Sequence, residues 1–240
     1  MSILIMRKVD PAGVKTDFNA FVVEREAHFT RIEALLEGSA HEKKDLSVLS
    51  ETMLHSVYVA FEVFLSDLML AYINRDFSAY QESLKGHINT SVSTKFGVGA
   101  AARTTFAVSR HIKIQDLEQL IDPTGWNLTF KDVSELQSKF ADWVVPAYGA
   151  GVGALSESDK LLIDTTRAIR NFIAHRSEGS KSVMNDKLLT VSSGGGCPNF
   201  SLPRGDHKIN DVGAYLKANS VGQRRLLPFM ERLKNIAASL

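Results

Sequence analysis

The sequence predicts an all-α fold, a helical bundle with room for one small β-hairpin in its C-terminal region. Apolar residues recur three and four positions apart over several long segments, which is the spacing of one helix face. Segments with the alternation of a half-buried strand are few. Hydrophobic residues make up 44% of the 240 positions and charged residues 23%. These are ordinary values for a globular protein with a sizeable core.

Two long helices are expected at the start of the chain. The first covers residues 14–37 and is followed by a glycine, a common helix terminator. The second covers residues 42–74 and has a broad apolar face, typical of a central helix that is contacted on several sides. Its most apolar stretch, residues 57–73, is interrupted by Glu62 and Asp67. That stretch therefore predicts a buried core helix rather than a membrane span.

The middle of the chain gives weaker signals. Residues 86–102 are rich in Ser, Thr and Gly and predict a loop, and three glycines in residues 146–153 predict a break in the chain. The other expected elements are a short helix at 77–84, a partly helical segment at 103–120, an extended segment at 126–130 and an amphipathic helix at 133–141.

The clearest helix is expected at residues 156–176. Ser156 and Asp159 match the capping pattern that precedes many apolar helical runs, and Gly179 is expected to close the helix. The stretch after it is polar and contains several glycines and prolines. The remaining expected elements are a loop at 180–210 that holds a hairpin of residues 187–191 and 200–202, and two closing helices at 211–218 and 223–238.

One domain covering residues 1–240 is expected, because no internal repeat and no strong domain boundary interrupts the sequence. Its core is expected at about residues 45–178. The N-terminal helix, residues 11–38, and the C-terminal segment, residues 179–240, are expected as appendages to that core.

Charge and cysteine content narrow the classes of function. The formal net charge is +1, so any contact with RNA is expected to be confined to a local patch. The lone cysteine, Cys197, excludes a disulfide or a thiolate metal cluster within one chain. Residues 1–10 lack the order of charge and apolar run that marks a secretory signal. We therefore expect a cytoplasmic protein without a membrane segment.

A polar face on the expected helix at 156–176 carries the candidate chemistry. At about 100° per residue, with Arg167 at zero, Asn171 falls near 40°, Asp164 near 60° and His175 near 80°. Arg170 falls at about −60°, but its long side chain can reach back over a turn. The solvated face of a surface helix would have the same composition.

The order of residues near the end of this helix favours a functional interpretation. Arg170–His175 reads R-N-F-I-A-H, which resembles the signature of the HEPN superfamily: an arginine, a polar residue, a short spacer and a histidine near the end of a core helix. Residues 59–65 resemble the first core helix of HEPN proteins close to the RiboL-PSP-HEPN group, and residues 126–130 are also similar. The resemblance covers roughly residues 45–178.

The resemblance implies metal-free RNA cleavage by Arg170, Asn171 and His175. Histidine transfers protons near neutral pH, and an arginine fork neutralises the charge of a phosphorane-like transition state. Arg167 and Glu62 are second-rank candidates for substrate binding. For Arg167, an ordinary surface arginine is an equally good interpretation. For Glu62, a purely structural ion pair with Arg170 is equally good.

The resemblance also sets expectations about partners. HEPN proteins usually form homodimers in which two motifs face one shared cleft, and many act in prokaryotic toxin or phage-defence systems, with an antitoxin or another defence protein as partner. Some carry a tyrosine two residues after the histidine that a partner enzyme modifies; here that position is Ser177, which puts such silencing in doubt. The alternatives are a non-catalytic HEPN module that binds nucleotide, RNA or protein, and a plain helical interaction protein.

Other signals are weaker. Residues 97–102 match G-x-G-x-x-A, but a dinucleotide site needs a strand before this motif. No cluster has metal-ligand spacing, so neither a metal nor an organic cofactor is expected. Scattered surface charge is the simplest interpretation of five basic residues that are candidates for RNA contact: Arg103, Arg110, Lys113, Arg224 and Arg225. The remaining histidines show no ligand spacing: His28, His41, His55, His87, His111 and His207.

Overall fold

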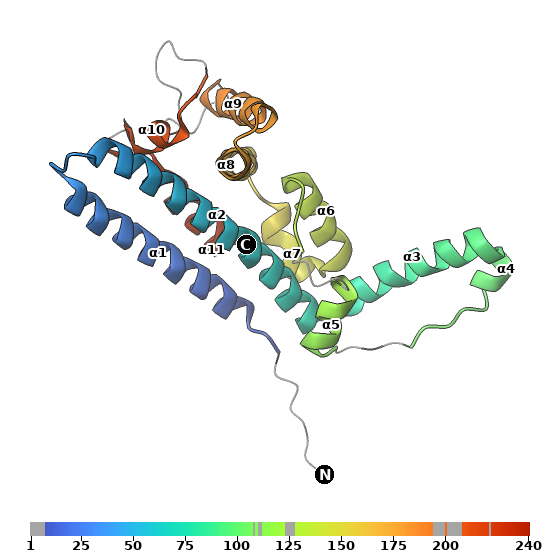
Figure 1. Cartoon of the computed structure of the whole chain (residues 1–240). Helices are drawn as coiled ribbons and strands as arrows, with labels where there is room; N and C mark the ends of the chain where they lie inside the picture. Colours follow the sequence, from blue (N-terminus) through green and yellow to red (C-terminus); the bar gives the residue numbers. More distant parts are fainter. Residues whose placement is uncertain are drawn as a thin grey trace. The chain divides into compact units, whose positions relative to one another are not determined.

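The structure, a computed structural model, describes residues 8–107, 109, 112–122, 128–193, 200, 208–220 and 222–240. Helices dominate this part of the chain (Figure 1), so the expected all-α class is confirmed. The sheet found among these residues has two short antiparallel strands, β1 (Asn219–Ser220) and β2 (Gln223–Arg224). The helices are α1 (Pro11–Leu36), α2 (Glu42–Arg75), α3 (Ser78–Phe96), α4 (Val98–Ala101), α5 (Ile114–Ile121), α6 (Val133–Trp143), α7 (Pro146–Gly153), α8 (Glu157–His175), α9 (Glu178–Ser193), α10 (Val212–Lys217) and α11 (Leu226–Ser239).

The chain divides into two compact units. Unit 1 contains the described residues up to Val14, residues Val63–Ala154 and Leu240; unit 2 contains Lys15–Glu62 and Leu155–Ser239. The division falls inside α1 and α2. The expectation of one domain with two appendages stays a prediction. All candidate catalytic residues belong to unit 2.

Unit 2 is built on α1, the first part of α2, and α8 to α11. Phe18 of α1 meets Phe61 of α2 with ring centroids 5.6 Å apart, and Glu26 of α1 pairs with Lys234 of α11 at 3.2 Å. Helices α8 and α9 pack against each other, and α11 also contacts α8. Burial of apolar side chains between these helices supplies the main stabilisation of the unit. Its most deeply buried large side chains include Phe29, Leu54, Phe61, Leu162, Ile169 and Phe229.

Helix α8 begins where the capping pattern predicts. The Ser156 hydroxyl accepts a hydrogen bond from the Asp159 backbone N–H at 3.2 Å, which satisfies one of the free donors of the first turn. The helix ends at His175, next to the expected end, because Arg176 adopts a left-handed conformation with φ 50°. Ser177 then accepts a hydrogen bond from the N–H of Ser180 at 3.2 Å in the first turn of α9. Gly179 therefore lies inside the next helix and does not terminate α8.

The expected loop at 180–210 is wrong in its first part, which belongs to α9. Met184, Leu188 and Val191 are buried and recur at helical spacing, although the surrounding residues are polar. The expected hairpin strand at 187–191 is therefore wrong, and residues 201–202 lie outside the described residues. A hairpin does occur in the C-terminal region, as β1 and β2. The two closing helices, α10 and α11, are confirmed with slightly shifted ends.

Unit 1 contains two further corrections. Helix α3 continues to Phe96, through most of the expected loop at 86–102. Tyr80 is its buried residue, so α3 has no apolar face that a periodicity analysis could detect. The expected break at 146–153 is helix α7, whose first residue is Pro146; proline suits that position because it has no N–H and its φ is already helical.

Aromatic contacts hold unit 1 together. Tyr72 stacks on Tyr148 with ring centroids 5.5 Å apart, and Tyr80 meets Trp143 edge-on at 5.4 Å. Helix α6 confirms the amphipathic segment at 133–141, and α5 confirms a helix within 103–120. Of the expected extended segment, residues 128–130 have no regular structure, and residues 126–127 lie outside the described part.

Helix α2 confirms the second expected helix. Among the described residues it is the one helix long and apolar enough to cross a membrane by length and composition alone. The core helix of a soluble protein passes the same test, and 61% of the most apolar window of α2 is buried inside the protein.

Gly213 of α10 lies against α2 in unit 2. A Cβ at this position would be 2.8 Å from Ser47 Cβ and 2.9 Å from the Ser47 carbonyl oxygen. We expect Gly213→Ala to destabilise the protein by roughly 1–3 kcal/mol, because overpacking forces one helix away from the other. Urea denaturation measures this change. In the control, Gly86→Ala in α3, the new Cβ has open space, so stability is expected to hold or rise slightly. Equal stability of Gly213→Ala and wild type would contradict the close approach.

Candidate active site on helix α8

The polar face of α8 is partly buried against α2. The Arg170 guanidinium forms an ion pair with Glu62, with Nη2 and Oε2 2.9 Å apart, and these side chains are 26% and 19% exposed. Arg170 Nη1 donates to Asn171 Oδ1 at 2.9 Å. The Nε of Arg170 is buried, and it has no hydrogen-bond partner within the part of the chain that the structure describes. One guanidinium is thus oriented by two neighbours and keeps one buried donor unpaired.

A second arginine contributes to the same electrostatic cluster. Burial raises the pKa of Glu62, while the positive charges of Arg170 and Arg167 oppose that shift. Burial also raises the pKa of Tyr58, which is 2% exposed, and the Glu62 carboxylate adds to this rise. The two arginines therefore favour the charged form of a carboxylate that burial alone would disfavour.

Helix α9 covers another edge of this face. Lys187 Nζ donates to Asp164 Oδ2 at 3.0 Å, so Asp164 is directed toward α9. The polar face of α8 accordingly meets both α2 and α9 within unit 2.

His175 is not among the residues that contact the Arg170 guanidinium in the interactions described above. It is exposed at the last position of α8. The next residue, Arg176, pairs with Glu51 of α2 and lies 5.2 Å from the centroid of the Phe172 ring. The end of α8 is thus anchored to α2 while the histidine side chain stays accessible to a ligand.

Helix α2 provides a second side of the site. Glu62 was the residue of this helix expected there, and its ion pair with Arg170 is present. Glu51, His55, Tyr58 and Glu62 are spaced by four, three and four positions, which places them on one face of that helix. Ion pairs or electrostatic interactions link each of them to an arginine in or just after α8. This helical spacing of polar residues within an apolar helix was the available signal.

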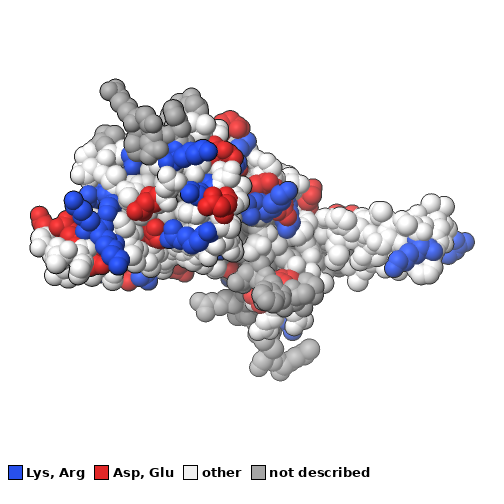
Figure 2. Space-filling model, turned by 45° about the horizontal axis from the view of Figure 1, so that its top comes forward, with Lys and Arg blue, Asp and Glu red and all other residues white. Residues whose placement is uncertain are grey.

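Two of the basic residues considered for RNA contact have partners within the protein. Arg224 pairs with Glu33 of α1, and the buried Arg225 donates to the Tyr215 carbonyl oxygen at 2.8 Å. Arg110 lies outside the described residues. On the face of the molecule that Figure 2 shows, basic and acidic side chains are interspersed. A local site therefore fits this charge distribution better than a long nucleic-acid track.

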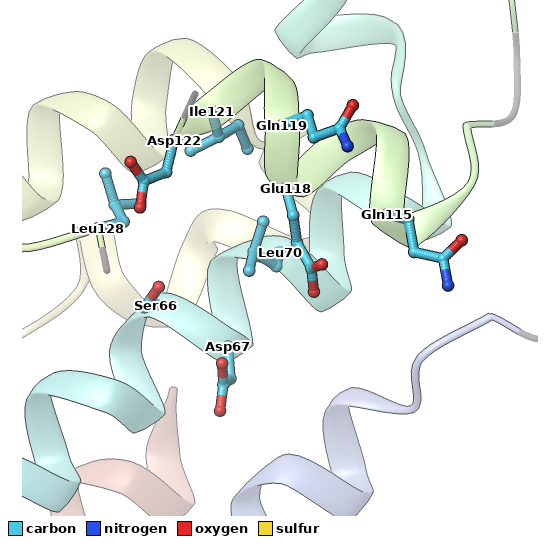
Figure 3. A pocket seen from close by; sticks show the side chains of 9 residues that line it. All are labelled: Ser66, Asp67, Leu70, Gln115, Glu118, Gln119, Ile121, Asp122 and Leu128. Atoms are coloured by element: carbon cyan, nitrogen blue, oxygen red, sulfur yellow. The ribbon is translucent and has the colours of Figure 1, made fainter. Parts of the chain in front are cut away.

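A cavity of about 440 Å³ in unit 1 is a second candidate (Figure 3). Its lining includes Asp67 of α2, Glu118 of α5 and Asp122. Burial raises the pKa of Asp67, and the neighbouring Glu118 adds to the rise. Three carboxyl groups repel a phosphate, so this cavity does not suit RNA. Among the described residues, no group of three or more His, Cys, Asp or Glu side chains could hold a metal ion.

No family model, curated protein or solved structure matches this chain.

Proposed function

We propose that the protein is a metal-independent endoribonuclease of the HEPN type. The observation that carries the proposal is the Arg170 guanidinium, which Glu62 and Asn171 orient while its buried Nε stays unpaired. A buried unpaired donor is costly, and the Arg170 side chain is still 26% exposed, so a ligand can contact part of it. A phosphate oxygen is the acceptor that suits a guanidinium best.

The proposed reaction is transesterification within the RNA. The 2′-oxygen attacks the adjacent phosphorus, the bond from phosphorus to the 5′-oxygen breaks, and a 2′,3′-cyclic phosphate remains. Arg170 stabilises the charge that develops on the phosphate oxygens. His175 transfers one of the two protons. Asn171 holds Arg170, Arg167 adds positive charge for a phosphate, and Glu62 acts by positioning Arg170 rather than by touching RNA.

The proposed setting follows the family resemblance. The protein is proposed to be a cytoplasmic homodimer that brings two α8 helices to one RNA phosphate. In a prokaryotic toxin or phage-defence system it would act with an antitoxin or another defence protein. A dimer supplies a second copy of Arg170 and His175, so that one site has both a proton acceptor and a proton donor.

The alternative is a non-catalytic HEPN module that binds nucleotide, RNA or protein. The contact between Arg170 and Glu62 also favours this function, because a guanidinium that is already paired with a carboxylate suffices as a structural element. A binding module would hold RNA at Arg167 and Arg170 without cutting it.

Cleavage of an oligoribonucleotide in EDTA tests the proposal. We expect activity to persist, because the 2′-hydroxyl is an internal nucleophile and no metal-activated water is needed. The products should carry a 2′,3′-cyclic phosphate and a 5′-hydroxyl, which mass spectrometry distinguishes from 5′-phosphate ends. The same sequence made of 2′-deoxynucleotides is the control and should stay intact. Activity that is lost in EDTA, or products with 5′-phosphates, would rule the mechanism out.

A further inference from the structure

His55 is a second histidine in the electrostatic cluster, and it comes from the opposite helix. It lies on α2, is half-buried, and interacts electrostatically with Arg170 of α8. In the sequence this histidine has no metal-ligand spacing to another histidine. Its spacing from Glu51 and Glu62 instead places it on the face of α2 that meets α8.

Two ion pairs bracket this histidine. One turn before it, Glu51 pairs with Arg176; two turns after it, Glu62 pairs with Arg170 at 2.9 Å. These contacts anchor α2 to α8 on both sides of the imidazole. His55 therefore lies on the part of α2 that these two ion pairs join to Arg170 and Arg176.

The surroundings of His55 favour the neutral imidazole. Burial and the positive charge of Arg170 both lower its pKa, because each disfavours a second cation. Among the described residues, Arg170 is the charged group from a neighbouring helix that acts on it. On its own helix, Glu51 lies one turn before it and Tyr58 one turn after it. A neutral imidazole accepts protons at neutral pH.

We propose that His55 is the general base of this site and takes the proton of the 2′-hydroxyl. This inference rests on the proposed ribonuclease function and adds a residue to it. The 2′-oxygen forms its bond to phosphorus as its proton passes to the His55 imidazole. The bond from phosphorus to the 5′-oxygen breaks, and the His175 imidazolium donates a proton to that oxygen. In this assignment His55, rather than a second copy of His175, is the proton acceptor of the site.

The test compares kcat/KM for cleavage of one oligoribonucleotide across pH 4–9 by wild type, His55→Ala, His55→Gln and His175→Ala, all as the full chain. His41→Ala is the matched control, because His41 is exposed and precedes α2. We expect both His55 variants to lose roughly a hundredfold or more. Gln preserves the size and polarity of the site, so equal loss in both variants separates chemistry from folding.

Three further readouts identify a base. In wild type, activity falls at acid pH as His55 becomes protonated, and this acid limb should flatten in His55→Gln. Added imidazole should restore cleavage by His55→Ala. Anisotropy with a 2′-deoxy version of the oligonucleotide should show unchanged binding in both variants.

The possible failures are distinct. Wild-type rates in His55→Gln with an inactive His175→Ala would overturn the role of His55 and leave the proposed function standing. A weakened affinity that accounts for the whole loss, with the acid limb intact, would also overturn it. An uncut oligonucleotide with wild type, or full activity in His175→Ala, would overturn the proposed function and this inference together.

Discussion

His175→Ala is expected to slow RNA cleavage by roughly a hundredfold to ten-thousandfold, the usual contribution of a positioned proton-transfer group. The side chain is exposed at the last position of α8. Its removal leaves no cavity, and stability is expected to change by less than about 0.5 kcal/mol. Single-turnover cleavage of an oligoribonucleotide, measured beside a thermal melt, separates the two effects.

The matched control for this variant is His87→Ala. His87 is an exposed histidine of α3 in unit 1, so the substitution removes the same chemical group away from the candidate site and should leave cleavage unchanged. RNA binding by His175→Ala should also persist, because Arg167 and Arg170 remain. Cleavage by His175→Ala at the wild-type rate would remove this residue from the mechanism.

Arg170→Ala is expected to reduce cleavage by roughly a hundredfold to a thousandfold, because the transition-state charge loses its donors. This variant also leaves Glu62 without its ion pair, so its fold is expected to be less stable. Arg170→Lys preserves a positive charge beside Glu62 but lacks the planar fork that contacts two oxygens. We expect Arg170→Lys to melt close to wild type and still to lose most of its activity.

Mixing the two inactive variants tests the proposed shared site. A dimer of one Arg170→Ala chain and one His175→Ala chain contains one intact arginine and one intact histidine. Activity in the mixture above that of either variant alone would support a site built by two chains. An Arg170→Lys protein that cleaves like wild type would show that charge alone suffices and would contradict the fork-like role of Arg170.

Helices with local signals could be assigned from the amino-acid sequence. Ser156 starts α8 because its hydroxyl binds the N–H of a residue three positions later, and that contact needs no tertiary neighbour. The long apolar face of α2 and the amphipathic α6 were equally evident, because their periodicity reports a buried face directly. Arg170 and His175 were candidates for another reason, because the sequence R-N-F-I-A-H resembles the HEPN signature.

Other helices depend on packing that composition did not indicate. In α9, Met184, Leu188 and Val191 recur at helical spacing, but the polar residues around them indicated a loop. Burial of these three side chains and packing of α9 on α8 stabilise the helix. The left-handed Arg176 decided where α8 ends and α9 begins.

The electrostatic cluster likewise depended on packing between segments far apart in the sequence. Glu62 and His55 acquire their roles because α2 lies against α8, which places a carboxylate and an imidazole beside the Arg170 guanidinium. The helical spacing of the polar residues marks one face of α2, but it does not show which helix packs against that face. Burial raises the pKa of Glu62 and lowers the pKa of His55. Both shifts arise because the packed helices exclude solvent, which disfavours the charged form of each group.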